Sequence, residues 1–289
     1  MSLYLTSLNS GSNGNCYYIG NGTDAVLIDA GISCRETERR MMRLGLSIRK
    51  VKAIFISHEH TDHTRGAEIL SRKFRIPVYV TEATYRNSRL NLDPLMVRSF
   101  SPGISLNTGD LCVMPFPKMH DASEPHSFTV SANGITAGVF TDIGTACEQV
   151  VHHFSQSHAA FLEANYDEKM LENGRYPVFL KRRIQGMEGH LSNDQALELF
   201  TTHRSPLMQL LILSHLSAEN NHPDLVHKIF SKHSNGTKIV VASRYEESEV
   251  FRVEFSPGGI TGSLPGFLLP GYGTEAAIDA LSPSHTEDT

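Results

Sequence analysis

Three histidines and two carboxylates lie within residues 58–63, directly after the apolar segment Ala53 to Ile56. His58, His60, Asp62 and His63 form the pattern His-x-His-x-Asp-His. In extended chain alternate residues point the same way, so His58 and His60 can face one point while Asp62 and His63 follow on the next turn. Imidazole and carboxylate groups are common ligands of divalent metals. The alternative, an ordinary polar loop, explains the composition but not the spacing, so the pattern favours a metal-dependent hydrolase.

Two metal ions need more than four side chains, and three further residues follow apolar, strand-like segments. His120 comes after 111–116, Asp142 after 135–140, and His215 after 210–213. Each stands where an apolar run gives way to a polar turn. They are therefore the best candidates for the remaining ligands.

The composition is that of an ordinary globular protein with a sizeable core. The chain has 289 residues, 40% of them hydrophobic and 20% charged, which fits one large domain or two closely packed halves. A net charge of −5 does not indicate nucleic-acid binding by the chain as a whole. The four cysteines show no CxxC pair, and we expect reduced thiols in a cytoplasmic protein. The first seven residues resemble neither a signal peptide nor a membrane span.

The order of predicted elements favours an α/β fold. Strand-rich stretches are followed by helices, twice over, which suggests two sheets packed face to face with helices outside. Gly20-Asn21-Gly22 and Asn133-Gly134 predict tight turns because Asn and Gly tolerate positive φ. We expect a domain over residues 1–255 and an irregular or mobile tail over 256–289, which is rich in Gly and Pro. The predicted strands cover 17–19, 25–28, 53–56, 111–116, 127–130, 135–140, 159–162 and 210–213, and the predicted helices 35–44, 64–74, 145–153, 167–172, 178–184 and 193–203.

Taken in order, the candidate ligands resemble those of the metallo-β-lactamase superfamily. The resemblance implies a four-layer αβ/βα sandwich with two divalent ions, Zn or Mn, at one edge of the sheets. It assigns His58, His60 and His120 to the first ion and Asp62, His63 and His215 to the second. Asp142 would bridge the two.

Several longer motifs resemble the YycJ/WalJ branch of this superfamily over residues 3–255. The branch is bacterial, and its members resemble 5′-to-3′ exonucleases that act on double-stranded DNA. His126 departs from the branch pattern, in which a small or aliphatic residue is usual. The motifs are Ser10-Gly-Ser-Asn-Gly-Asn-Cys16, Ile28-Asp-Ala-Gly31, His120-Asp-Ala-x-Glu-Pro125, Glu163-Ala-Asn-Tyr-Asp167, Gly189-His-Leu-Ser-Asn193 and His215-Leu-Ser-x-x-Asn-Asn221.

The same resemblance suggests roles for residues beside the ligands. Asp62 would orient the attacking water, and His190 would give a proton to the leaving 3′-oxygen, as a histidine does in the related tRNA-processing nucleases. Glu163 would orient a histidine. The alternatives are a helix cap or a supporting contact for His190 and a surface or capping role for Glu163. The loop 10–15 could bring backbone N–H groups to a phosphate, or be only a tight turn.

Two basic clusters, residues 35–52 and Lys181 to Arg183, would suit contacts with backbone phosphates, although each could also be a solvated helix face. Neither is interleaved with enough aromatic residues to predict base stacking. The remaining helical or helix-end histidines are set aside as surface or capping groups: His152, His153, His203, His222, His227 and His233.

We therefore expect a metal-dependent phosphodiesterase, a 5′-to-3′ DNA exonuclease that uses a metal-bridging hydroxide. One alternative is a small-molecule ester, thioester or lactone hydrolase of the same fold, since the fold and the metal site do not separate the two. The other is a metal-binding protein without turnover. Asp62 and the full set of candidate ligands argue against this alternative. The expected partner is double-stranded DNA. The sequence does not decide between Zn and Mn, or indicate an oligomeric state.

Overall fold

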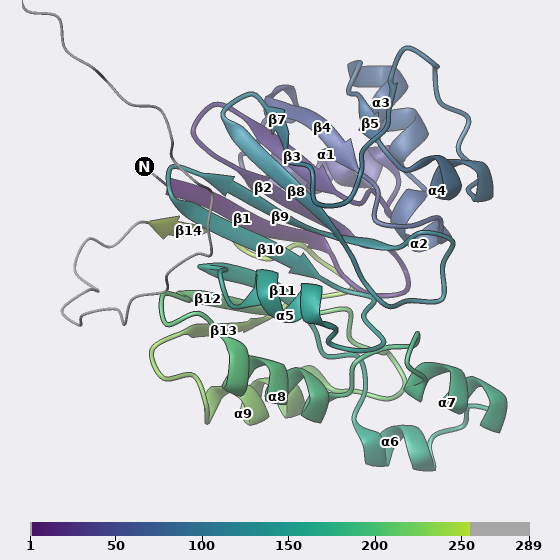
Figure 1. Cartoon of the computed structure of the whole chain (residues 1–289), viewed down its shortest axis with the longest axis vertical. Helices are drawn as coiled ribbons and strands as arrows, with labels where there is room; N and C mark the ends of the chain where they lie inside the picture. Colours follow the sequence, from purple (N-terminus) through teal and green to yellow (C-terminus); the bar gives the residue numbers. More distant parts are fainter. Residues whose placement is uncertain (1, 255–289) are drawn as a thin grey trace, which may run out of the picture. The chain divides into compact units, whose positions relative to one another are not determined.

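Two β-sheets form the centre of the fold, as the computed structural model shows for the residues that it describes, 2–254 (Figure 1). Each sheet has seven strands. The expectation for the tail, 256–289, lies outside the described residues. No helix within residues 2–254 has the length and apolar character to cross a membrane.

The first sheet runs antiparallel at its amino-terminal strands and parallel from β3 to β6. The predicted hairpin between β2 and β3 is confirmed, but its turn has another cause. Asn21 Oδ1 accepts the backbone N–H groups of Thr23 and Asp24, at 2.8 and 2.7 Å, so the side chain closes the turn. The strands, in sheet order, are β14 (Phe251–Glu254), β1 (Ser2–Asn9), β2 (Cys16–Gly20), β3 (Ala25–Ile28), β4 (Val51–Phe55), β5 (Val78–Tyr79) and β6 (Val97–Arg98).

The second sheet is antiparallel from β7 to β10 and parallel from β10 to β13. The tight turn between β9 and β10 is confirmed, because Asn133 and Gly134 have φ values of 55° and 78°. The strands, in sheet order, are β13 (Lys238–Val241), β12 (Leu210–Ser214), β11 (Ala159–Glu163), β10 (Ile135–Phe140), β9 (His126–Ala132), β8 (Leu111–Pro117) and β7 (Leu106–Thr108).

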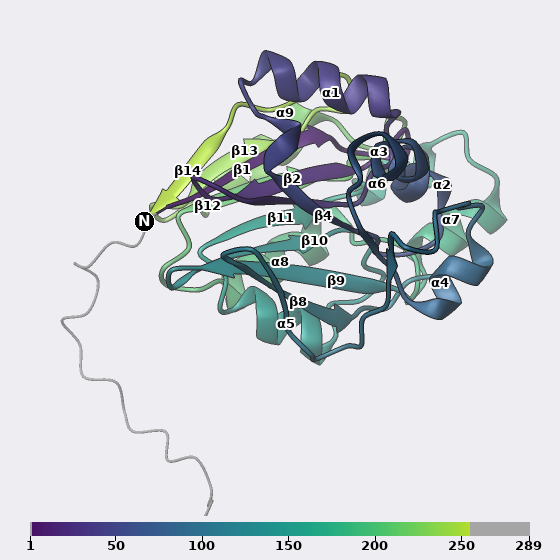
Figure 2. The same ribbon diagram turned by 90° about the horizontal axis from the view of Figure 1, so that it is seen from above.

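Helices cover the outer face of each sheet, which confirms the four-layer arrangement (Figure 2). One apolar cluster lies between the sheets, a second packs the first sheet against α1 and α3, and a third packs the other sheet against α5, α8 and α9. The helices are α1 (Cys34–Arg43), α2 (Thr61–Thr64), α3 (Ala67–Phe74), α4 (Glu82–Asn87), α5 (Glu148–Phe154), α6 (Glu168–Asn173), α7 (Val178–Gln185), α8 (Asn193–His203) and α9 (Pro223–Ser231), with a 3₁₀ turn at Ile48–Lys50.

One predicted helix is divided in the structure, while others shift by one to three residues at their ends. The expected helix 64–74 is divided into α2 and α3, because the N–H of Gly66 donates to Ala30 O at 2.7 Å and interrupts the helical hydrogen bonding. This break lets α2 carry Asp62 and His63 in a turn separate from the long helix.

Candidate metal centre

The predicted ligands lie at the ends of four strands of the two sheets. His58 to His63 follow β4, His120 follows β8, Asp142 follows β10, and His215 follows β12. Polar side chains that follow buried strands can meet without entering the core. The structure brings all seven predicted ligands together in groups whose ligand atoms lie within 4.8 Å of one another.

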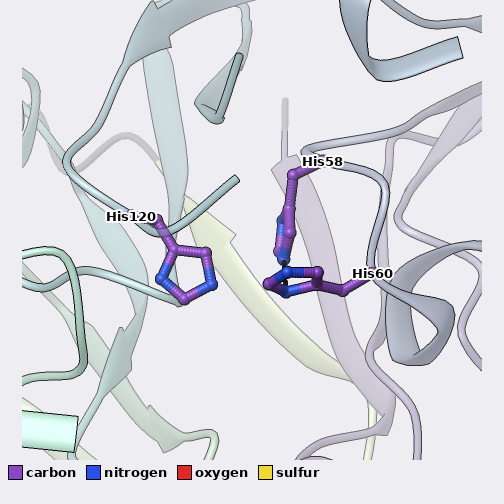
Figure 3. Close-up of side chains that lie close together, drawn as sticks. All are labelled: His58, His60 and His120. Carbon is purple, nitrogen blue, oxygen red and sulfur yellow. Dashed lines mark hydrogen bonds between the residues drawn. The ribbon is translucent and has the colours of Figure 1, made fainter. Parts of the chain in front are cut away.

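The first group consists of His58, His60 and His120 (Figure 3). Nε2 of His58 lies 3.0 Å from Nδ1 of His60, and the rings of His58 and His120 have centroids 4.8 Å apart. His58 Nδ1 faces the Ser57 hydroxyl at 2.9 Å, and His120 Nδ1 faces Gly189 O at 3.2 Å. Their other ring nitrogens are thus directed towards the site.

The second group consists of Asp62, His63 and His215. Oδ2 of Asp62 lies 3.4 Å from Nε2 of His63 and 3.8 Å from Nε2 of His215. These are the same two trios that the family resemblance implied.

Asp142 lies between the two groups. Its Oδ1 is 3.8 Å from Nε2 of His120 and 3.5 Å from Nε2 of His215, and its Oδ2 is 3.3 Å from Nε2 of His63. A carboxylate that reaches both groups has the placement of a bridging ligand. The carboxyl is buried, which alone would raise its pKa, but His215 and His63 hold the pKa well below its usual range.

Two buried carboxylates hold the histidines of the second group from behind. His63 Nδ1–H donates to Asp29 Oδ2 at 2.7 Å, and His215 Nδ1–H donates to Glu163 Oε1 at 2.8 Å. Because a carboxylate only accepts, each contact fixes the hydrogen on Nδ1 and leaves the lone pair of Nε2 facing the site. Burial would raise the pKa of Glu163, but the charges of His190 and His215 and their hydrogen bonds lower it to about 2.

The ring nitrogens that face the site support metal binding. Nε2 of His120 and Nε2 of His215 are buried and have no hydrogen-bond partner among residues 2–254. Buried polar atoms without a partner are uncommon in native proteins. Imidazole nitrogens combined with carboxylate oxygens suit Zn²⁺ and Mn²⁺ alike. The donor set therefore fits two divalent ions.

The backbone is held in an unusual conformation at this edge. Asp29, Asp142 and His215 have φ values of 61°, 54° and 56°, a left-handed conformation that side-chain-bearing residues rarely adopt. Each follows a strand, with one residue between β10 and Asp142; Asp142 and His215 belong to the ligand groups, and Asp29 contacts His63. Such conformations cluster at functional sites because surrounding contacts must maintain them.

The loop 10–15 supports Asp62. Its N–H groups at Gly11, Gly14 and Asn15 all donate within the protein, to Asn15 Oδ1, Gly11 O and Asp62 O. The interpretation that they approach a phosphate is therefore wrong for these three groups. Instead Nδ2 of Asn15 lies 3.1 Å from Asp62 Oδ2 and 3.1 Å from His63 Nε2.

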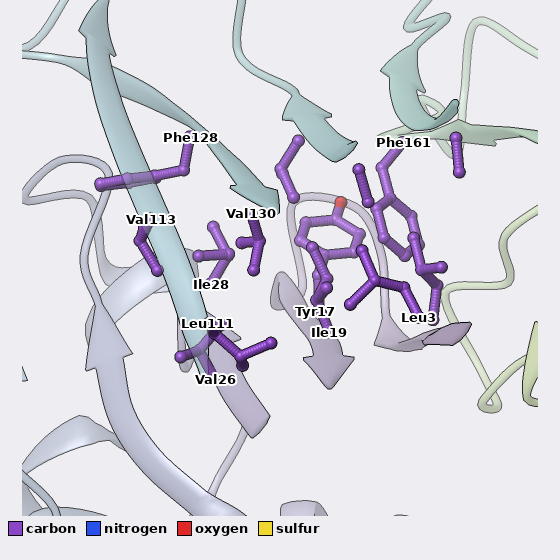
Figure 4. Close-up of a cluster of buried hydrophobic side chains, with 14 of the residues drawn as sticks. Leu3, Tyr17, Ile19, Val26, Ile28, Leu111, Val113, Phe128, Val130 and Phe161 are labelled. Carbon is purple, nitrogen blue, oxygen red and sulfur yellow. The ribbon is translucent and has the colours of Figure 1, made fainter. Parts of the chain in front are cut away.

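Below this loop, Tyr17 connects the site to the core between the sheets (Figure 4). Its ring packs on Phe161 with centroids 4.7 Å apart. Its hydroxyl donates to Asn15 Oδ1 at 3.1 Å and is 2.8 Å from Ser10 Oγ, which accepts the backbone N–H of His215 at 2.7 Å. The packing of one aromatic ring thus helps to position groups near both Asp62 and His215.

His190 lies beside both ligand groups, and its side chain is partly exposed. Its Nδ1–H donates to Glu163 Oε1 at 2.8 Å, and its ring centroid lies 5.3 Å from that of His120 and 5.2 Å from that of His215. Ser192, not His190, caps α8, through a capping box with Gln195. About a fifth of the His190 side chain is exposed (21%).

Sequence reasoning missed the groups that support these ligands. Asp29 belongs to the motif Ile28–Gly31, which indicates no role for it, although it follows β3 as Asp142 follows β10. Lys118 had no signal at all: it is buried, and Nζ donates to Thr141 O at 2.7 Å. Burial lowers the pKa of Lys118, and the charges of the Asp142 and Asp29 carboxylates act in the opposite direction.

His126, the departure from the branch pattern, begins β9 and packs edge-on against Phe100, with ring centroids 5.1 Å apart.

The two basic clusters differ in how they are used. In the first, Arg40 is buried and donates to Leu8 O, and Arg43 is paired with Glu247. The prediction that this cluster contacts phosphates is therefore wrong for Arg40. The second cluster lies on α7, where Arg182 is exposed and Arg183 donates to Asp121 Oδ2 at 2.5 Å. Asp121 directly follows the candidate ligand His120, so α7 borders the site.

Comparison with known proteins agrees with this arrangement. The model of the metallo-β-lactamase superfamily matches residues 10–121. Exodeoxyribonuclease YycJ from Bacillus anthracis is 34% identical over 228 residues, which cover 78% of this chain and 86% of the relative. Exodeoxyribonuclease WalJ from Streptococcus pneumoniae is 30% identical over 225 residues, which cover 76% and 84%.

A solved structure shows the same fold at low identity. The metallo-β-lactamase fold protein YhfI from Bacillus subtilis superposes with a TM-score of 0.66 at 16% identity, over 87% of this chain and 99% of that one. The two-sheet architecture, the sequence identity to YycJ and WalJ, and the family match lead to one conclusion. The chain belongs to the metallo-β-lactamase superfamily, in the branch that contains the exodeoxyribonucleases YycJ and WalJ.

Proposed function

We propose that this chain is a metal-dependent exodeoxyribonuclease that hydrolyses double-stranded DNA from a 5′ end. The observation that carries the proposal is the pair His190–Glu163, which places a partly exposed imidazole beside both ligand groups. A phosphodiester has an alkoxide leaving group, which needs a proton in the transition state.

The residues divide the reaction between them. Two divalent ions held by the seven ligands would lower the pKa of a water and neutralise charge on the phosphoryl oxygens. Asp62 would orient the attacking water and take up its proton, and Asn15 Nδ2 holds the carboxylate by donating to Oδ2 at 3.1 Å. On the leaving side, His190 gives its proton to the 3′-oxygen. The ionised Glu163 balances the charge of protonated His190 and holds its ring.

A nucleic-acid substrate is supported by the surface beside His190. Lys181, Arg182 and Arg183 lie on α7, and the chain runs from this helix directly to His190. Phe179 on the same helix is 73% exposed. Positive charge next to the site would bind the phosphates that flank the scissile bond. The relatives named exodeoxyribonuclease direct the proposal to DNA.

The proposal also includes the identity of the metal and the cellular location of the protein. We assign Zn²⁺ or Mn²⁺, because both accept imidazole and carboxylate ligands. We place the protein in the bacterial cytoplasm, where reduced thiols are maintained. In support, Cys16, Cys34, Cys112 and Cys147 are all free, and the relatives are bacterial.

A substrate panel tests the proposal. Protein loaded with Mn²⁺ or Zn²⁺ is incubated with duplex DNA labelled at the 5′ or the 3′ end, with RNA of the same sequence, and with a lactone and a thioester. We expect early release of labelled mononucleotide from the 5′-labelled duplex only. Turnover of the lactone or thioester without nucleotide release would instead assign a small-molecule hydrolase.

A further inference from the structure

A cavity of about 460 Å³ adjoins the metal centre beyond His215. We call it the Arg244 pocket. Its walls come from three segments that are distant in sequence: Ser10 of the first loop, six residues between Leu216 and Pro223 that do not include Glu219 or Asn220, and the residues from Val241 to Tyr245. Small-molecule sites commonly have volumes of ~300–1,000 Å³. The pocket is therefore large enough for one nucleotide.

The pocket is joined to the metal centre by direct contacts. Leu216 follows His215 in the chain, and Ser10 Oγ accepts the N–H of His215 at 2.7 Å. Ser10 N–H in turn donates to Ser243 O at 3.2 Å. The wall of the pocket and the candidate ligand His215 are therefore held together by hydrogen bonds through Ser10.

The lining residues include hydrogen-bond donors suited to a phosphate. Nη1 of Arg244 is buried and has no acceptor within residues 2–254, while its Nη2 donates to Ser12 Oγ at 3.3 Å. The hydroxyls of Ser217 and Ser243 accept backbone N–H groups, from Asn220 at 3.2 Å and Tyr245 at 3.0 Å. Each hydroxyl keeps its hydrogen for another acceptor.

The charge of the lining also favours an anion. No carboxylate is among the lining residues in the described part of the chain, although the whole protein carries a net charge of −5. Pro223, the first residue of α9, borders the cavity, and the amino end of a helix carries partial positive charge. A planar guanidinium with free N–H groups is the usual partner of a phosphate.

Tyr245 provides a surface for a base. It lines the cavity beside Arg244, and its side chain is exposed (79%). Exposed aromatic rings stack with nucleobases, whereas a buried ring could not. The pocket therefore offers hydrogen-bond donors for the phosphate of a nucleotide and an aromatic ring for its base.

We infer that the Arg244 pocket binds the terminal nucleotide of the DNA strand, with its 5′-phosphate on Arg244 and its base on Tyr245. The inference rests on the proposed 5′-end exonuclease function and extends it, because an enzyme that removes one nucleotide at a time must recognise the end. A bounded pocket of one-nucleotide size next to the metal ligands would provide that recognition.

Two measurements test the inference, and the first does not require DNA cleavage. Binding of deoxyadenosine 5′-monophosphate and of deoxyadenosine to the metal-loaded full chain is followed by calorimetry. We expect Arg244→Gln to weaken binding of the monophosphate about tenfold or more, and Tyr245→Ala to weaken it about fivefold or more. Arg252→Gln, an exposed arginine on β14, should leave binding unchanged. Equal affinity in wild type and Arg244→Gln would overturn the inference.

The second measurement compares duplexes that begin with a 5′-phosphate or a 5′-hydroxyl. The ratio of kcat/KM on the two ends should favour the phosphate in wild type and fall about tenfold in Arg244→Gln and in Ser217→Ala, which removes only a hydroxyl. An unchanged ratio in both variants contradicts the inference. If the wild type cleaved no DNA, the proposed function would fail, while the calorimetric comparison would still decide whether the pocket binds a nucleotide.

Discussion

Oε1 of Glu163 lies 2.8 Å from Nδ1 of His190. The same oxygen lies 2.8 Å from Nδ1 of His215, so one buried carboxylate holds both the proposed proton donor and a proposed metal ligand. A change at Glu163 would therefore disturb the candidate metal centre and the proposed proton donor together.

Replacement of Glu163 should affect both functions at once. Glu163→Gln keeps the shape but removes the charge and offers an amide in place of the second acceptor oxygen. We expect metal affinity to fall about 10–100-fold, as for other residues that orient ligands, and kcat to fall at saturating metal. Metal titration and single-turnover kinetics measure the two effects. A variant with normal affinity and normal kcat would show that Glu163 only fills space.

Replacement of His190 should separate the two functions. His190→Ala removes the proton donor but no member of the two ligand trios, so we expect normal metal content and a kcat lowered about 10²–10⁴-fold. The matched control is His152→Ala, an exposed histidine on α5. Loss of metal from His190→Ala, measured by elemental analysis, would instead make His190 a ligand.

Gly31 maintains the position of Asp62 through close backbone contact. A Cβ at this position would lie 1.6 Å from Asp62 O and 2.6 Å from Asn15 N. Gly31→Ala must displace one of these segments, and we expect a loss of at least about 1–3 kcal/mol in the free energy of unfolding together with weaker metal binding. In Gly22→Ala the new Cβ meets nothing within 4 Å, and a change within about 0.5 kcal/mol is expected. Similar melting curves for both variants would refute the packing argument.

Glu36 should make stability depend on pH. Burial would raise its pKa, but hydrogen bonds from Arg40 and Arg39 lower the pKa below its usual value. A lowered carboxyl pKa contributes stability above the unfolded-state value of about 4.3, and this contribution is lost as the pH falls through the folded-state pKa. Glu36→Gln should therefore cost about 1 kcal/mol at pH 7 and progressively less below about pH 4.3.

Urea unfolding at pH 7 and at pH 3.5 measures this difference. The control is Glu68→Gln, which removes another i,i+4 pair with arginine, but one whose partner Arg72 is 68% exposed, whereas Arg40 is buried. Its effect should be smaller at pH 7. A difference between wild type and Glu36→Gln that grew towards low pH would reverse the predicted sign.

The sequence predicted which side chains meet at this edge because their signal is local. The pattern from His58 to His63 lies in one turn, and Asp142 and His215 each stand at the end of an apolar strand, so strand order alone brings them to one edge. Lys118 and Asn15 could not be predicted, because their roles depend on contacts with residues far away in the chain, Thr141 and Asp62.

The same distinction applies to the fold. Long apolar strands such as β10 and β12 were predicted, whereas β5 and β6, of two residues each, exist only through pairing with their neighbours. The role of the basic segment at α1 could not be read from charge alone. The buried guanidinium of Arg40 donates to the backbone carbonyl oxygens of Leu8 and Tyr245, at 2.7 and 2.8 Å, and so connects these two segments.

The central claim is that Asp62 and the ligand groups around it form the catalytic centre of a DNA exonuclease. The most direct test is mononucleotide release from 5′-labelled duplex DNA by metal-loaded wild type and by Asp62→Ala, with and without a chelator. We predict release that requires metal and falls at least about 10³-fold in Asp62→Ala, since both a ligand and the residue that orients the water are lost. Release that persists at the wild-type rate in Asp62→Ala, or in the presence of chelator, would contradict this account.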